Sequence, residues 1–219
     1  MAPLTIDVVS DVVCPYCYLG KRRLERALTL AAEVDVVVRW RPYRLDPTIP
    51  PGGIDREEYM TAKFGSLAAI EPAHQRLVES GRAEGIDYRF ERIRRAPDTV
   101  NAHRLARWAV PSGRQGAMVE RLFAAYFTEG RDVGDLGVLA GLAGEVGLDP
   151  VAVAARLASD EDRDAVIAEI DNAYRIGVTG VPCFILDQRY AVVGAQSAEV
   201  IAGAIRQAAG SKVEAAASA

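Results

Sequence analysis

The sequence predicts an α/β fold in which a long helical insertion divides one small α/β domain. Strand-like segments occur only near the two ends of the chain, and helical spacing of apolar residues fills the part between them. Read in order, the elements are β-α-β, the insertion, and then β-β-α. This layout assigns residues 1–53 and 178–210 to the α/β domain, residues 54–177 to an all-helical insertion, and residues 211–219 to a mobile tail of small residues.

The first strand, helix and strand are predicted before residue 44. Residues 4–9 are an alternating apolar stretch, and residues 20–28 have the apolar spacing of a helix. Residues 34–43 are β-branched and aromatic, which indicates a second strand. Residues 45–53 contain three prolines and two glycines, so they cannot continue that strand. They form the connection to the insertion.

Stop and start signals divide the insertion into separate helices. The predicted helices end at glycines, which are typical C-terminal caps. These glycines are Gly65, Gly85, Gly130, Gly147 and Gly177. Asp149-Pro150 places a capping residue before a proline at the first helical position, and residues 159–162, Ser-Asp-Glu-Asp, resemble a capping box. We therefore expect helices that start at both places.

A hairpin and a helix are predicted after the insertion. Residues 181–186 and 190–194 have strand composition, and residues 187–189 form the turn between them. An amphipathic helix is predicted from about residue 197 to residue 208, before the tail. Successive side chains of a strand point to opposite faces, so Cys183 is expected to be a small buried hydrophobe. A role as a third redox thiol is the alternative.

Composition argues against several classes of partner. With 219 residues, half of them apolar, the chain can bury a substantial core. Its net charge of −4 gives no reason to expect nucleic-acid binding. The first residues lack the basic and apolar regions of a signal peptide, and no apolar run approaches the length of a membrane helix. We therefore expect a cytoplasmic protein, in a reducing compartment, without a membrane partner.

Two thiols lie at the predicted turn between the first strand and the first helix. The segment reads Cys14-Pro15-Tyr16-Cys17. Positions three apart on a helix share a face, so Cys14 and Cys17 can close into a small disulfide ring. The unpaired N–H groups and the positive dipole end of the helix favour a thiolate at Cys14. A C-x-x-C beside a strand–helix pattern, in a chain without an export signal, predicts a thioredoxin-like redox site.

The same four residues also have structural interpretations. Proline is favoured in the first helical turn whether or not chemistry follows, and Tyr16 could be a half-exposed aromatic. A structural disulfide across so short a loop would constrain the unfolded chain little. A zinc site needs four ligands, and beyond the pair the chain offers only Cys183, His74 and His103. We therefore predict a redox pair and no metal.

Five segments of the chain resemble segments of one known protein family. They are Asp11–Lys21, Ala102–Leu105, Ala125–Phe127 with Gly130, Gly177–Pro182 and Val193–Gln196. Together they resemble the DsbA-like thioredoxin family, and most closely its FrnE-like branch, over nearly the whole chain. The resemblance implies a thioredoxin fold with a helical insertion and a redox centre at Cys14 and Cys17. It also implies a cis-proline at Val181-Pro182, whose backbone pairs with substrate beside Cys14.

The chain departs from the usual pattern of that family at two positions. Tyr16 stands where relatives often have tryptophan or histidine, so their redox potentials do not transfer. Asp98 stands where relatives tend to have asparagine, which puts a polar ligand contact there in doubt. His103, inside one of the resembling segments, is a candidate for the cleft, although a histidine without an identified partner is more often a helix-packing residue.

The preferred interpretation is a thiol-disulfide oxidoreductase that acts on protein or small-molecule disulfides. Cys14, expected to be the more exposed thiol, forms the mixed disulfide and Cys17 resolves it. The residues expected to contact substrate are Pro15, Tyr16, Val181 and Pro182. A reducing cytoplasm favours the reductase or isomerase direction. No bound cofactor is expected, but glutathione is a candidate reductant or ligand because glutaredoxins share the Cys-Pro-Tyr-Cys motif.

Two alternatives stay open. The first is a glutathione-dependent isomerase or transferase that acts on a small organic substrate. The related 2-hydroxychromene-2-carboxylate isomerases and kappa-class glutathione transferases usually carry serine at the position of Cys14, so retention of both cysteines argues against it. The second is a chaperone-like protein whose insertion binds peptides. The sequence names neither the substrate nor the oligomeric state.

Overall fold

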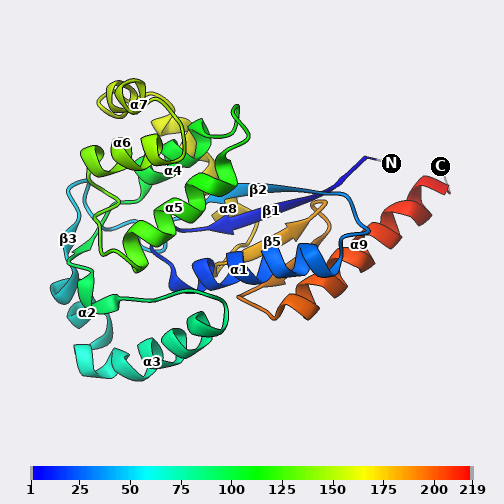
Figure 1. Cartoon of the computed structure of the whole chain (residues 1–219), viewed down its shortest axis with the longest axis horizontal. Helices are drawn as coiled ribbons and strands as arrows, with labels where there is room; N and C mark the ends of the chain where they lie inside the picture. The colour runs from blue at the N-terminus through cyan, green and yellow to red at the C-terminus, as the bar shows by residue number, and fades with distance from the viewer. Residues whose placement is uncertain (1, 218–219) are drawn as a thin grey trace.

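A four-stranded sheet lies at the centre of the α/β part of the molecule. The computed structural model describes residues 2–217, with side chains described as far as Ser211. The strand order is β2-β1-β5-β6, with β1 and β2 parallel and the other neighbours antiparallel. The strands are β1 (Leu4–Ser10), β2 (Val36–Pro42), β5 (Cys183–Leu186) and β6 (Tyr190–Val193). Figure 1 shows β1 pointing toward the helical part of the chain.

Helices α1 (Pro15–Leu30) and α9 (Ala198–Ala217) lie side by side along one face of this sheet. The strands alternate, so Ile6, Val8 and Phe184 point into the core shared with these helices. Val9 and Cys183 point to the other face, where they pack with Ala173 from α8 (Arg163–Arg175). The sheet therefore has helices on both faces, as an α/β domain requires.

The insertion is helical except at a short ladder. Its helices are α2 (Arg56–Phe64), α3 (Leu67–Ala83), α4 (Val100–Trp108), α5 (Gln115–Phe127), α6 (Leu136–Glu145), α7 (Pro150–Leu157) and α8, with a 3₁₀ turn at Phe90–Arg92. β3 (Ile54–Asp55) pairs antiparallel with β4 (Arg95–Ala96), so the expectation of an all-helical insertion is wrong at this ladder. Strands of two residues carry no periodicity from which they could be predicted.

Most of the predicted caps are confirmed. The five predicted glycines all have positive φ, from 72° at Gly130 to 87° at Gly177. The Asp149 carboxylate accepts hydrogen bonds from two N–H groups at the start of α7, at 2.9 and 3.3 Å. The capping box at residues 159–162 is wrong: α8 begins after Asp162, whose carboxylate accepts the Trp108 indole N–H at 2.8 Å instead.

The C-terminal part follows the prediction except at its end. β5 and β6 form the expected hairpin, with positive φ at Asp187 and Gln188 in the turn. Helix α9 continues to Ala217 rather than ending at residue 208, because the alanine-rich segment has high helix propensity. Residues 218–219 of the predicted tail lie outside the described residues. Among the described helices, none has the length and apolarity needed to span a membrane.

Candidate active site

The Cys-x-x-Cys segment lies where β1 turns into α1. The Cys14 N–H donates to the Asp11 carbonyl at 3.0 Å, and the Cys17 N–H donates to the Cys14 carbonyl at 3.0 Å. Cys14 is the cap residue of α1, and Pro15 occupies the first turn. Both cysteines are free thiols, with exposed fractions of 4% at Cys14 and 0% at Cys17. The expected difference in exposure between the two thiols is therefore small.

The segment before β5 lies against Cys14. The Val181–Pro182 peptide bond is cis, as predicted, and the Cys14 thiol donates to the Val181 carbonyl at 3.6 Å. The structure thus brings Cys14 together with a segment more than 160 residues away in the sequence. Tyr16 is 47% exposed beside this pair. The predicted contact residues therefore meet at one place on the molecule.

Gly20 makes room for Pro182 on the face of α1. A Cβ atom at Gly20 would lie 2.7 Å from Pro182 Cγ and 3.3 Å from Phe184 Cζ. In a helix interior alanine is normally more favourable than glycine by about 1 kcal/mol. Here the ring of Pro182 cannot move aside without shifting the segment that faces Cys14. Glycine is therefore needed for close packing and not for backbone freedom.

We expect Gly20→Ala to lower both stability and thiol reactivity. Overpacking of this kind costs about 1–3 kcal/mol, more than the gain in helix propensity. Urea unfolding and the rate of disulfide exchange measure the two effects. Gly203→Ala in α9 is the matched control, because no atom lies within 4 Å of its added Cβ and it should be neutral or stabilising. Equal stabilisation by both substitutions would contradict the packing argument.

Cys17 is kept as a thiol by its surroundings. Burial, and then the hydrogen bond and charge of Cys14, raise the pKa of the Cys17 thiol well above its usual value. Hydrogen bonds from the Asp11 backbone and the Ser10 side chain lower this pKa in part. Cys17 is therefore held in its protonated form in the folded protein.

The raised pKa of Cys17 predicts a loss of stability at alkaline pH. The folded protein holds the Cys17 proton at pH values where the unfolded chain has released it. The stabilisation is therefore complete below the pKa of the unfolded thiol and declines as the pH rises toward the folded pKa. Above about pH 9 the free energy of unfolding of the reduced protein should fall by about 1.4 kcal/mol per pH unit more than that of Cys17→Ala. Urea unfolding at several pH values measures this, and parallel pH curves would refute it.

Tyr88 is a site residue that the sequence interpretation missed. Its hydroxyl donates to the Pro15 carbonyl at 2.6 Å, and burial together with the nearby Cys14 raises the pKa of Tyr88. The ring stacks on Phe90 with centroids 5.1 Å apart. Gly81 makes room for it, because a Cβ there would lie 2.5 Å from the Tyr88 ring. No local pattern near residue 88 indicates this contact.

Helix α5 is fixed to α1 just after the cysteines. The Tyr18 hydroxyl donates to Glu120 Oε1 at 2.9 Å, and Lys21 Nζ lies 2.8 Å from Glu120 Oε2. Tyr18 also stacks on Phe123 with centroids 5.1 Å apart. Burial and the Glu120 carboxylate raise the pKa of Tyr18 to about 12. Together with Tyr88, these contacts place the insertion directly against the start of α1.

The remaining candidates, His103 and Cys183, are both buried. His103 is buried, with Nε2 2.9 Å from the Tyr43 carbonyl and 3.5 Å from Asp11 Oδ1. It lines a cavity of about 60 Å³ between the sheet and the insertion. Cys183 is buried on the α8 face, where burial raises its pKa. Within the described part of the chain, no cluster of histidine, cysteine, aspartate and glutamate is arranged to hold a metal ion.

Comparison with known proteins assigns the fold. Residues 5–206 match the DSBA-like thioredoxin domain family. A probable DsbA oxidoreductase from Streptomyces coelicolor is 37% identical, with a TM-score of 0.87 over 94% of this chain and 90% of that chain. This level of identity extends nearly end to end, so the thioredoxin fold with a helical insertion applies to the chain as a whole.

Two solved structures of lower identity share this fold. A 2-hydroxychromene-2-carboxylate isomerase is 15% identical, with a TM-score of 0.72 over 96% of this chain and 98% of that chain. The cytosolic disulfide reductase DsbM from Pseudomonas aeruginosa, solved with GSH, is 22% identical, with a TM-score of 0.56 over 86% of this chain and 89% of that chain. The family match, the paired thiols and the prolyl segment beside them agree: the chain belongs to the DSBA-like thioredoxin domain family.

Proposed function

We propose that the protein is a thiol-disulfide oxidoreductase that works through a mixed disulfide at Cys14. The observation that carries this proposal is the position of the Cys14 thiol, at the N-terminus of α1 and 3.6 Å from the Val181 carbonyl, with Cys17 one turn along the same helix. The helix dipole favours negative charge at this end. An extended substrate can pair with the backbone beside Val181 while its disulfide reaches Cys14.

The exchange proceeds in two balanced steps. Cys14 attacks one sulfur of a substrate disulfide, forms a mixed disulfide and releases the other sulfur as a thiolate. Cys17 then loses its proton and attacks Cys14, so that a Cys14–Cys17 disulfide forms and the second substrate thiolate leaves. Two electrons have passed from the protein to the substrate, and a low-molecular-weight thiol must reduce the protein disulfide again.

We assign the reductase or isomerase direction, in the cytoplasm, with glutathione as the thiol. A reducing compartment holds a pair of this kind as the dithiol. The structurally similar DsbM from Pseudomonas aeruginosa, a cytosolic disulfide reductase solved with GSH, supports the same assignment. Glutathione is thus a co-substrate in this proposal rather than a resident cofactor.

Insulin reduction tests the proposed function. The reduced protein with glutathione should precipitate insulin chains faster than glutathione alone, and Cys14→Ser should remove the whole difference. Cys183→Ala is the matched control, since it removes the thiol on the other face of the sheet and should retain most activity. An inactive wild-type protein that is folded by circular dichroism would refute the proposal.

A glutathione-dependent isomerase is the second candidate function. The structural similarity to a 2-hydroxychromene-2-carboxylate isomerase favours it, with coverage of nearly all of both chains. In that case Cys14→Ser should retain glutathione binding and isomerisation, while insulin reduction should be absent in the wild type. Isothermal titration of both proteins with glutathione separates the two functions.

A further inference from the structure

The first turn of α1 leaves the Tyr16 N–H group without an acceptor inside the helix. Cys14 is the cap residue, and Pro15 after it has no N–H. The N–H groups of Cys17 and Tyr18 both donate to the Cys14 carbonyl, at 3.0 and 3.3 Å. Tyr16 occupies the second helical position, whose N–H commonly donates to the side chain of the cap residue. Its N–H is therefore the backbone donor available to the Cys14 sulfur.

The Cys14 sulfur changes from a donor to an acceptor when it ionises. As a thiol it donates to the Val181 carbonyl at 3.6 Å. A thiolate has no proton to donate, so it loses this bond and gains a charge that hydrogen-bond donors stabilise. The proposed exchange begins with this thiolate. The direction and strength of the Tyr16 N–H therefore affect the first step.

The Tyr88 hydroxyl holds the other end of the same peptide unit. It donates to the Pro15 carbonyl at 2.6 Å, and the carbon of this carbonyl is covalently bonded to the Tyr16 nitrogen. A hydrogen bond to an amide oxygen polarises the amide, so that its N–H becomes a stronger donor. Burial raises the pKa of Tyr88, so the hydroxyl keeps its proton well into the alkaline range. Tyr88 thus acts on the donor without touching the sulfur.

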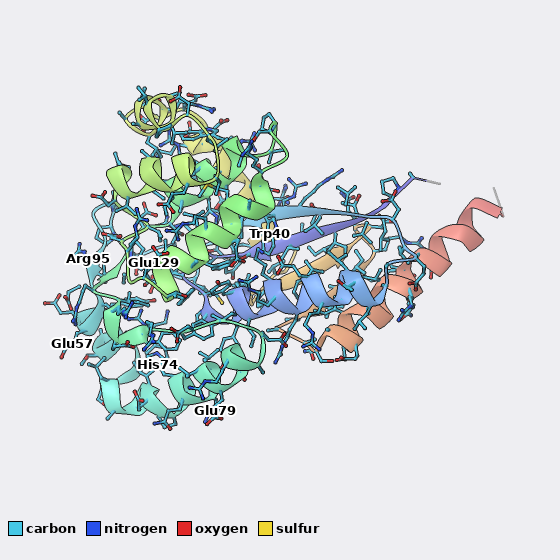
Figure 2. The ribbon with its side chains drawn as sticks, viewed as in Figure 1. Trp40, Glu57, His74, Glu79, Arg95 and Glu129 are labelled. Atoms are coloured by element: carbon cyan, nitrogen blue, oxygen red, sulfur yellow. The ribbon has the colours of Figure 1, made fainter. Side chains whose placement is uncertain are left out.

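Packing holds the Tyr88 ring, and with it the hydroxyl, in one position. The side chain is only 3% exposed. Its ring stacks on Phe90 with centroids 5.1 Å apart. It also meets the rings of Tyr18 and Phe127 edge-on, at 6.0 and 5.6 Å. His74 of α3, labelled in Figure 2, stacks on Phe90 in turn at 4.1 Å. The hydroxyl is therefore placed by the aromatic core of the insertion.

Ionisable groups approach Tyr88 from α1 and α3. They are Cys14, Tyr18 and Cys17 on α1 and, beyond the neighbouring ring, His74 on α3. The Tyr18 hydroxyl donates to a carboxylate on α5 at 2.9 Å. Tyr88 is thus the side chain of this group whose hydroxyl donates to the backbone of the first turn of α1.

We propose that Tyr88 is a positioning residue for the Cys14 thiolate: through the Pro15 carbonyl it holds and polarises the peptide unit whose N–H stabilises the sulfur. This inference rests on the proposed function. The thiol proton leaves to solvent, and the Cys14 thiolate then accepts a hydrogen bond from the Tyr16 N–H until it attacks the substrate disulfide. Tyr88 keeps its own proton throughout, so Cys14 is the group that changes protonation in this step.

Alkylation of Cys14 at several pH values measures the thiolate directly. In a Cys17→Ala, Cys183→Ala background, Cys14 is the remaining thiol. Tyr88→Phe keeps the ring and removes the hydroxyl. Below the midpoint of the pH profile, its rate with iodoacetamide should be about threefold lower than that of the background protein. The same effect should move the midpoint of the profile to higher pH by about half a unit.

The equilibrium of the protein disulfide with glutathione gives a second measure. In Cys183→Ala protein near neutral pH, Tyr88→Phe should lower the equilibrium constant for reduction by about threefold, because the dithiol form loses stabilisation. Acid quenching and alkylation before mass spectrometry give the reduced fraction. Gly81→Ala keeps the hydroxyl but displaces it, since the added Cβ would lie 2.5 Å from the Tyr88 ring. It should change both measurements in the same direction.

Tyr126→Phe is the matched control. The Tyr126 side chain is also buried, and its hydroxyl donates at 3.1 Å to the carbonyl of Arg95, which Figure 2 labels. This variant should lose about as much stability in urea as Tyr88→Phe and leave both thiol measurements unchanged. Unchanged values in folded Tyr88→Phe and Gly81→Ala, or equal changes in Tyr126→Phe, would overturn the role of Tyr88. Insulin reduction tests the proposed function separately: an inactive wild type that shows the expected alkylation shift would overturn that function and not the role of Tyr88.

Discussion

Cys14→Ser is expected to abolish disulfide exchange, whereas Cys17→Ser is expected to hold partner proteins as long-lived mixed disulfides. A serine at position 14 cannot form the first covalent bond, so exchange should fall by at least about a thousandfold. A serine at position 17 leaves the first step intact and removes the internal thiol that displaces the partner. The two substitutions therefore act on successive steps of one reaction.

Non-reducing electrophoresis and peptide mapping measure this difference. Each variant is incubated with a disulfide-containing peptide and quenched with acid and an alkylating reagent. Adducts should be mapped to Cys14 in the Cys17→Ser protein and should be absent from the Cys14→Ser protein. Cys183→Ser is the matched control, because Cys183 packs with Val9 and Ala173 on the opposite face of the sheet. Equal adduct formation in both active-site variants would contradict the assignment of Cys14 as the attacking thiol and Cys17 as the resolving thiol.

The sequence was sufficient to predict the strand, turn and helix that hold the two thiols. The alternating pattern of residues 4–9 predicted β1, and the strand composition around Cys183 predicted the burial of that thiol. The paired thiols were predictable because the strand, the turn and the helix that hold them are adjacent in the chain. The Val181–Pro182 segment was predicted only through the family resemblance, since a Val-Pro pair has no local signature of its own.

The surroundings of the thiols could not be predicted in the same way. Tyr88 reaches Pro15 across 73 positions of sequence, and His103 reaches Tyr43 across 60. Contacts between residues so far apart depend on how the insertion packs against the rest of the chain. Local periodicity predicts helices and strands but not that packing. The failed cap at Ser159 has a similar cause: the local pattern favours it, but Trp108 and Arg104 on α4 bind the segment in another conformation.

Arg104 is among the largest fully buried side chains of the described residues, and it joins α4 to the end of α7 and the loop that follows. Its guanidinium donates to the carbonyls of Arg156 at 2.9 Å, Ser159 at 2.7 Å and Glu161 at 2.7 Å. Carbonyls at the end of a helix have no partners within the helix, and Arg104 supplies partners after α7. Its guanidinium carbon also lies 4.9 Å from the centre of the Trp108 ring.

Arg104→Met is therefore expected to destabilise the protein by about 2–4 kcal/mol, because methionine fills much of the space but donates no hydrogen bond to the Ser159 and Glu161 carbonyls. A midpoint of thermal unfolding lower by about 10 °C is expected for a chain of this size. The control is Arg107→Met, one turn along α4, whose side chain is 42% exposed in ion pairs with Asp162 and Glu169. Exposed ion pairs contribute less than about 1 kcal/mol. Similar losses for the two variants would mean that charge, and not the hydrogen bonds to the backbone carbonyls, makes arginine necessary at position 104.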